Sequence, residues 1–146
     1  MSMSRQEQFK YDVAISFLST DESLARELQV RLSERLEVFV YYDRQEELVG
    51  TDGMETFSQK FSTESRIVVV LHRKNWGSVS FTRVEQTAIK NRGFQEDWGF
   101  LLVIPLDSPS TVPDWYPITR IWYDFNLYGV DGATGGPFKL VWRGFV

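Results

Sequence analysis

The chain has 146 residues, 42% of them hydrophobic and 15% aromatic, which is enough to bury one independently stable core. Its formal net charge of −4 supplies no broad cationic surface for DNA or RNA, so we expect no direct nucleic-acid binding. The absence of cysteine excludes disulfides, thiolate zinc sites and a cysteine nucleophile, and it fits the cytoplasmic location that we expect. No signal-peptide pattern and no apolar run of membrane-spanning length occurs, so we expect no membrane association.

Five short runs rich in β-branched and aromatic residues predict five strands. Two of them contain the stretches 67–71 and 100–104, in which every residue is apolar. Strands that do not alternate with polar residues are typical of a parallel sheet covered by helices on both faces. The predicted strands are 11–17, 38–42, 66–71, 99–106 and 121–125.

Two segments between the first three strands carry apolar residues at helical spacing. The first is 21–36, and Ser19 with Glu22 predicts a capping box at its start. Asp52 and Glu55 repeat this capping pattern at the start of a shorter second helix. The apolar stripes consist of Leu24, Ala25, Leu28, Leu32 and Leu36 in the first helix, and of Met54, Phe57 and Phe61 in the second.

A third helix is predicted over 80–91, ending at Gly93. Glu85 is the polar exception near its apolar side, and no cation lies one turn away to pair with it. Such a carboxylate requires a distant partner, a solvated position at the helix edge, or a functional cleft, and the pattern leaves all three open. The predicted inner side consists of Phe81, Val84, Ala88 and Ile89.

Strands that alternate with helices predict an α/β fold: a doubly wound, five-stranded parallel sheet in the flavodoxin-like order 2-1-3-4-5. Ligands of such folds bind at the carboxyl ends of the strands. Prolines predict an irregular loop over 107–119. We expect a polar lead at 1–10, one domain at 11–128, and a glycine-rich tail at 129–146 that is compatible with the edge of a longer protein.

Other kinds of site find little support in the sequence. His72, the only histidine, follows the third strand and is interpreted as a strand-end polar residue, because no serine, cysteine or acid pattern accompanies it. No histidine pair or tight acidic cluster has metal-ligand spacing, so we expect no metal. The glycine signatures of Rossmann dehydrogenases and P-loop NTPases are absent, so we expect no bound cofactor.

Three stretches in chain order form a more specific pattern. The first is YDVAISF at 11–17, and the second is VYYD at 40–43 followed by LVG at 48–50. The third consists of Trp76, Phe81, Thr82 and Glu85. Over about residues 9–128 they resemble the TIR (Toll/interleukin-1 receptor) family, being similar to its opening strand, its BB loop, and its aromatic, tryptophan, cysteine and glutamate positions.

The resemblance implies a function, because a helical glutamate cleaves NAD in the enzymatic branch of this family. The matching residue is Glu85, which implies an NAD glycohydrolase or cyclase effector in bacterial antiphage immunity, with NAD as substrate. Nicotinamide leaves as a neutral group, so no general acid is needed, and one carboxylate can stabilise the oxocarbenium-like ribosyl centre. The sequence does not choose between ADP-ribose and a cyclic product.

The resemblance also implies a nucleotide-binding region and partners. We expect homotypic self-association through the BB loop, at about residues 43–52, and a possible sensor domain or partner outside this chain. Phe81 matches a frequent tryptophan, although a core aromatic is an equal interpretation. Leu18 and Ser19 depart from the basic residues that some members carry, and Val79 replaces a frequent serine. The implied substrate-binding residues are Leu18, Ser19, Asp43, Leu48, Gly50, Trp76 and Phe81.

Two alternatives stay open. A non-enzymatic TIR adaptor that signals through homotypic contacts is favoured by the missing basic residues after the first strand, whereas Glu85 and the spacing of Phe81 favour the enzyme. Another flavodoxin-like module, such as a receiver domain or a nucleoside deoxyribosyltransferase, is the third interpretation. A receiver would require an acidic pair after the first strand and a lysine late in the sheet, and residues 19–22 fit this poorly.

Overall fold

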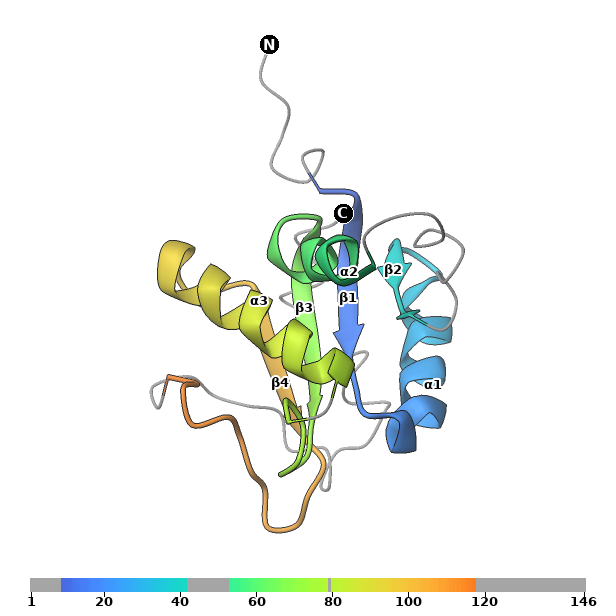
Figure 1. Ribbon diagram of the computed structural model, residues 1–146. Helices are drawn as coiled ribbons and strands as arrows, with labels where there is room; N and C mark the ends of the chain where they lie inside the picture. The colour runs from blue at the N-terminus through green and yellow to red at the C-terminus, as the bar shows by residue number, and fades with distance from the viewer. Residues whose placement is uncertain (1–8, 42–52, 79, 118–146) are drawn as a thin grey trace.

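The computed structural model describes residues 9–41, 53–78 and 80–117 (Figure 1). This part of the chain is α/β, with four parallel strands in one sheet of order β2-β1-β3-β4. The predicted order is confirmed for these four strands, while the predicted fifth strand at 121–125 lies outside the described residues, as does the tail. Within the described residues, no helix combines the length and apolarity needed to cross a membrane.

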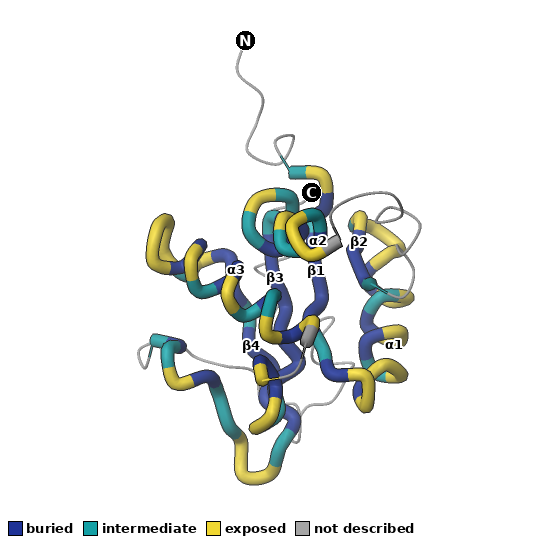
Figure 2. Tube along the Cα trace, in the orientation of Figure 1, coloured by how far each residue is buried: buried dark blue, intermediate teal, exposed yellow. Residues whose placement is uncertain are grey.

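The four strands are β1 (Tyr11–Ser16), β2 (Val38–Phe39), β3 (Ser65–His72) and β4 (Leu101–Pro105). β1 and β3 are buried along almost their whole length, which confirms the prediction of a sheet covered on both faces (Figure 2). β2 is shorter than the predicted run 38–42, because its ladder with β1 contains only two residue pairs. Val40 leaves that ladder and is nevertheless fully buried in the core.

One face of the sheet is covered by α1 (Glu22–Leu32), which packs Ala25, Leu28 and Leu32 against it. The predicted capping box is wrong, because Ser19 opens a short 3-10 helix, η1 (Ser19–Asp21), and makes no side-chain cap. α1 also ends four residues before the predicted limit at Leu36, since residues 33–36 form a turn closed by the Leu36 N–H bond to the Leu32 carbonyl, at 3.0 Å.

The opposite face is covered by α2 (Gly53–Ser62) and α3 (Ser80–Glu96). The prediction that α3 stops at Gly93 is wrong. A Cβ at position 93 would lie 2.2 Å from Cζ3 of Trp98, so the glycine makes room for the indole inside the helix. The helix ends instead at Glu96, and the next residue, Asp97, has a φ of 81°, the left-handed conformation common after a helix terminus. Its N–H donates to the Gly93 carbonyl at 3.0 Å.

The carboxyl ends of the strands share one edge of the sheet, where three connections meet. The connection after β4 is irregular over residues 107–117, as the prolines predict. Arg73, which follows β3, joins two of these connections: its guanidinium donates to Asp21 at 2.8 Å and to Asp107 at 3.3 Å. This ion-pair network holds the start of α1 close to the end of β4.

Candidate functional site

Glu85 lies on α3 and turns its carboxyl toward the sheet, with only 4% of its surface exposed. The hydroxyl of Ser16, the last residue of β1, donates a hydrogen bond to Glu85 Oε2. Ser16 Oγ in turn accepts a hydrogen bond of 2.8 Å from Trp76 Nε1. We call this arrangement the Trp76–Ser16–Glu85 chain. Of the three explanations for Glu85 that the sequence left open, a distant partner is therefore confirmed, and that partner is a neutral hydroxyl.

The burial of Glu85 changes its acidity. Loss of solvent raises the pKa of Glu85 from 4.5 to about 8, and the hydrogen bond from Ser16 opposes this rise. No cation pairs with the carboxyl among the residues that the structure describes. In the unliganded protein at neutral pH, Glu85 is therefore mainly the neutral acid.

The turn between β3 and α3 positions Trp76 beside Ser16. Gly77 in this turn has a φ of 91°, and a Cβ there would lie 2.8 Å from the side chain of Gln86. The Gly77 N–H donates to Thr82 Oγ1 at 3.1 Å, and its carbonyl accepts from Gln86 Nε2 at 3.2 Å. Glycine is thus required at position 77, and its contacts tie the turn to the first two turns of α3.

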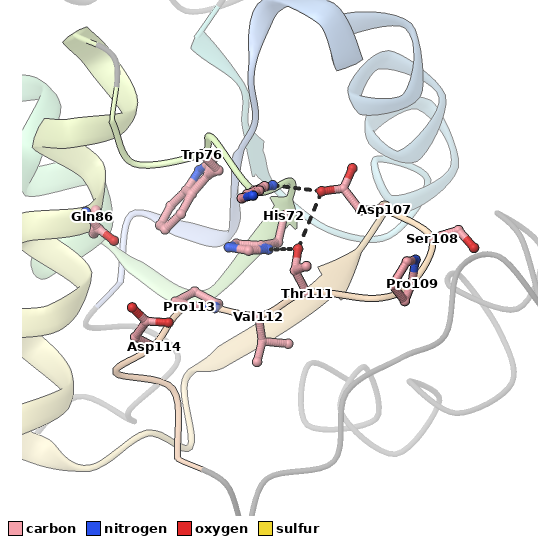
Figure 3. A pocket seen from close by; sticks show the side chains of 11 residues that line it. His72, Trp76, Gln86, Asp107, Ser108, Pro109, Thr111, Val112, Pro113 and Asp114 are labelled. Atoms are coloured by element: carbon pink, nitrogen blue, oxygen red, sulfur yellow. Dashed lines mark hydrogen bonds between the residues drawn. The ribbon is translucent and has the colours of Figure 1, made fainter.

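A cleft of about 870 Å³ lies beyond the carboxyl ends of β3 and β4, between α3 and the loop that follows β4 (Figure 3). Its volume is suited to a small organic ligand, and its place in the fold is where parallel α/β sheets bind ligands. The polar and aromatic residues of its wall include His72, Trp76, Gln86, Asp107, Thr111 and Asp114.

His72 occupies the wall of this cleft at the end of β3, as the strand-end interpretation predicts. Its Nδ1 lies 3.2 Å from Thr111 Oγ1, and that hydroxyl also donates to Asp107 Oδ2 at 3.5 Å (Figure 3). Burial lowers the pKa of His72, and the bond with Thr111 and the nearby carboxylates of Asp107 and Asp114 oppose this shift. The cleft wall therefore holds a neutral imidazole at neutral pH.

Asp107 is an acidic residue of the cleft wall whose carboxylate is held by several donors. The Lys74 N–H donates to its Oδ2 at 2.8 Å and Arg73 donates to its Oδ1 at 3.3 Å. These donors lower the pKa of Asp107. Because its charge is satisfied in this way, Asp107 shapes the loop after β4 and is not a free anion.

Trp76 connects the cleft with Glu85. Its side chain borders the cleft, and its Nε1 donates to Ser16, so the Glu85 carboxyl lies two hydrogen bonds from the cleft wall. Glu85 itself is not part of that wall, although the next residue, Gln86, is.

Among the predicted site residues that the structure describes, Trp76 and Glu85 are joined through Ser16. Phe81 is 41% exposed, which contradicts its predicted place on the inner side of the helix; its ring packs 5.0 Å from Tyr41 and 5.1 Å from Phe57, measured between centroids. Leu18 is buried in the core and Ser19 is exposed, and neither lines the cleft. Asp43, Leu48, Gly50 and Val79 lie outside the described residues.

Sequence reasoning missed Ser16 and the loop residues Asp107, Thr111 and Asp114. Ser16 carries a signal, since it is a polar residue in an otherwise apolar stretch of β1, at the end where ligands of such sheets bind. The loop residues carry none, because they approach His72 from 35 or more residues away in the chain.

In the described part of the chain, no three potential metal ligands gather into one group. No protein-family model matches the sequence, and no curated protein matches it significantly.

Proposed function

We propose that this protein is a TIR-type NAD glycohydrolase or cyclase, with a flavodoxin-like domain of five strands, in which Glu85 stabilises the ribosyl cation. One observation carries the proposal: the Glu85 carboxyl is buried without a cationic partner among the described residues, near the carboxyl ends of the strands, where parallel α/β folds bind ligands. The resemblance of Trp76, Phe81, Thr82 and Glu85 to the family pattern supports the choice of reaction.

The proposed reaction breaks the bond between C1′ of the ribose and the nicotinamide nitrogen. The bonding electron pair stays with nicotinamide, which leaves as a neutral molecule, and positive charge develops on the ribosyl centre. Only the ionised form of Glu85 can stabilise this charge, whereas the unliganded protein holds mainly the neutral acid. The cationic nicotinamide ring would favour the carboxylate, so NAD binding is expected to release a proton from Glu85.

Capture of the ribosyl centre completes the reaction. Attack by water gives ADP-ribose and releases one proton, whereas attack by the adenine base gives a cyclic product. Because Glu85 is 4% exposed, we propose that self-association through residues 43–52 opens its access to NAD, in cooperation with a sensor domain or partner outside this chain. The biological role would be NAD depletion in bacterial antiphage defence.

The first experiment measures NAD loss and nicotinamide release by chromatography, with the purified protein at high concentration and on a crowding surface. Glu85→Gln keeps the shape of the side chain and removes its charge, so we expect turnover to fall by a factor of about 100 or more. Glu34→Gln is the matched control and should retain full turnover, because Glu34 is exposed in the turn that follows α1. Undiminished turnover of Glu85→Gln would contradict the proposed mechanism.

A second candidate is a non-enzymatic TIR adaptor. Glu85 is bonded by Ser16 and stands outside the cleft wall, which is also the behaviour of a buried structural acid. In that case the protein self-associates without consuming NAD. Sedimentation analysis alongside the turnover assay separates the two candidates: association without turnover, in conditions where the oligomer is populated, supports the adaptor.

A further inference from the structure

We infer that Ser16 is a positioning residue for Glu85, with its hydroxyl proton directed at the carboxyl by the indole N–H of Trp76. This inference rests on the proposed function, which gives Glu85 its role. The sequence pattern did not identify Ser16, and Trp76 contributes to the positioning of Glu85 through its hydrogen bond to Ser16.

The direction of the chain follows from the chemistry of its members. An indole nitrogen only donates, so Trp76 Nε1 fixes Ser16 Oγ as its acceptor at 2.8 Å. A serine hydroxyl has one proton, and that proton is then free to point to Glu85 Oε2. Exposed fractions of 0% for Ser16 and 4% for each of the other two leave water little opportunity to compete.

The same bond distinguishes the two oxygens of the carboxyl. Oε2 is engaged by Ser16. Oε1 takes no hydrogen bond from the described residues. We therefore assign Oε1 as the oxygen that meets the ribosyl centre, while Ser16 holds Oε2 and so fixes the orientation of the carboxyl.

Ser16 also supports the form of Glu85 that the reaction needs. A hydrogen bond donated to a carboxylate stabilises its ionised form. Burial raises the pKa of Glu85 and the hydrogen bond from Ser16 lowers it, and no charged group of the described residues contributes to the shift. Loss of the hydroxyl should consequently make Glu85 harder to ionise.

The test is a titration of the Glu85 side-chain carboxyl by carbon-13 NMR, with the signal assigned from Glu85→Gln. We expect a midpoint near 8 in the parent protein and a midpoint higher by about one pH unit or more in Ser16→Ala. Ser65→Ala is the matched control. Ser65 is a fully buried serine on the neighbouring strand β3, and its hydroxyl has no partner in the described part of the chain, so its removal should leave the midpoint unchanged.

Trp76→Phe provides a second measurement if Ser16→Ala does not fold. It keeps an aromatic ring and removes the N–H that directs Ser16, so the Glu85 midpoint should again rise, by less than in Ser16→Ala. Midpoints equal to the parent value in both variants, or in the one that folds, would overturn the inference.

The titration separates this inference from the proposed function, because it needs no NAD. If the protein turns over NAD, the acid limb of its kcat/KM profile should move to higher pH in Ser16→Ala by the same amount as the titration midpoint. A shifted midpoint in a protein without NAD turnover supports the positioning of Glu85 by Ser16 and contradicts the proposed function. An unshifted midpoint in an active enzyme does the reverse.

Discussion

At the scale of single residues, Glu85 shows what the sequence can and cannot specify. Helical spacing identifies a carboxyl near an apolar face with no cation one turn away, and the structure confirms that it is buried. The spacing could not identify Ser16, because that contact joins residues 69 positions apart and depends on how α3 packs on β1. A local pattern can indicate that a partner is needed, whereas only the tertiary packing determines which residue it is.

The raised pKa of Glu85 predicts a pH-dependent stability. Folding raises this pKa from 4.5 to about 8, so the folded protein holds a proton that the unfolded chain releases. Its stabilising contribution is fully present below about pH 4.5 and is lost as the pH rises through 8. Glu85→Gln cannot titrate, so its free energy of unfolding should exceed that of the parent by a few kcal/mol, in order of magnitude, at pH 9.

Urea denaturation at pH 5, 7 and 9 measures this difference. At pH 5 the difference should be much smaller than at pH 9, because pH 5 lies only just above the pKa of 4.5 at which the unfolded chain releases the proton. The exposed substitution Glu34→Gln serves as the reference for a change of charge without burial. A difference between Glu85→Gln and the parent that does not change with pH would contradict the raised pKa.

At the scale of helices and strands, the sequence predicts the presence of the elements better than their ends. The apolar stripe of α1 and the buried runs of β1 and β3 correspond closely to the structure. In the predicted stripe of α2, Phe57 and Phe61 are buried, whereas Met54 is 48% exposed and does not belong to the buried face. The predicted cap of α1 at Ser19 and the predicted end of α3 at Gly93 were wrong. A serine or a glycine near a helix terminus can serve as a cap or a stop, but it can also make other contacts. Gly93 makes room for a tertiary contact, which no local pattern distinguishes from a helix stop.

We therefore expect Gly93→Ala to lower the free energy of unfolding, whereas the same substitution at an ordinary helix position raises it. Alanine in a helix normally stabilises relative to glycine by about 1 kcal/mol. Here the new methyl group would overlap Trp98, whose ring stacks on Trp115 at a centroid distance of 5.4 Å. We expect a net loss of about 1–3 kcal/mol in the free energy of unfolding, measured by urea denaturation.

The control for this variant is Asn91→Ala, on the exposed side of the same helix. It should change stability by less than about 1 kcal/mol, because helix propensity is its main effect. Equal or greater stability of Gly93→Ala than of the parent would show that the Trp98 contact does not constrain position 93.

At the scale of the whole molecule, the sequence predicts the sheet because a strand that is buried on both faces is apolar at nearly every position. The order of the four described strands was predicted from these apolar runs and from their alternation with helices, and the structure has the same order. The cleft has no comparable pattern in the sequence, because its wall is formed by residues from the end of β3, the loop after β4 and α3, which are far apart in the chain. The contacts of Arg73, which connect the end of β3 with Asp21 and Asp107, equally cannot be predicted from the sequence.

Arg73 should make a measurable contribution to the stability of the whole fold. It joins Asp21, which is 6% exposed, to Asp107 across the carboxyl edge of the sheet. Arg73→Met would leave the buried Asp21 carboxylate without this partner, and we expect a loss of about 2–4 kcal/mol in the free energy of unfolding. Asp21→Asn removes the buried charge, so adding it to Arg73→Met should restore part of that loss.

A double-mutant cycle over these variants, measured by urea denaturation at pH 7, gives the coupling between Arg73 and Asp21. We expect a coupling of about 1–3 kcal/mol, because the two side chains make bonds of 2.8 Å from both Nε and Nη2 of the guanidinium in a partly buried position. Arg35 on the surface near α1 provides the reference, since Arg35→Met should change stability by no more than about 0.5 kcal/mol. A coupling near zero would mean that the carboxyl edge is held together by its apolar packing, and that Arg73 only follows an arrangement set by β3 and β4.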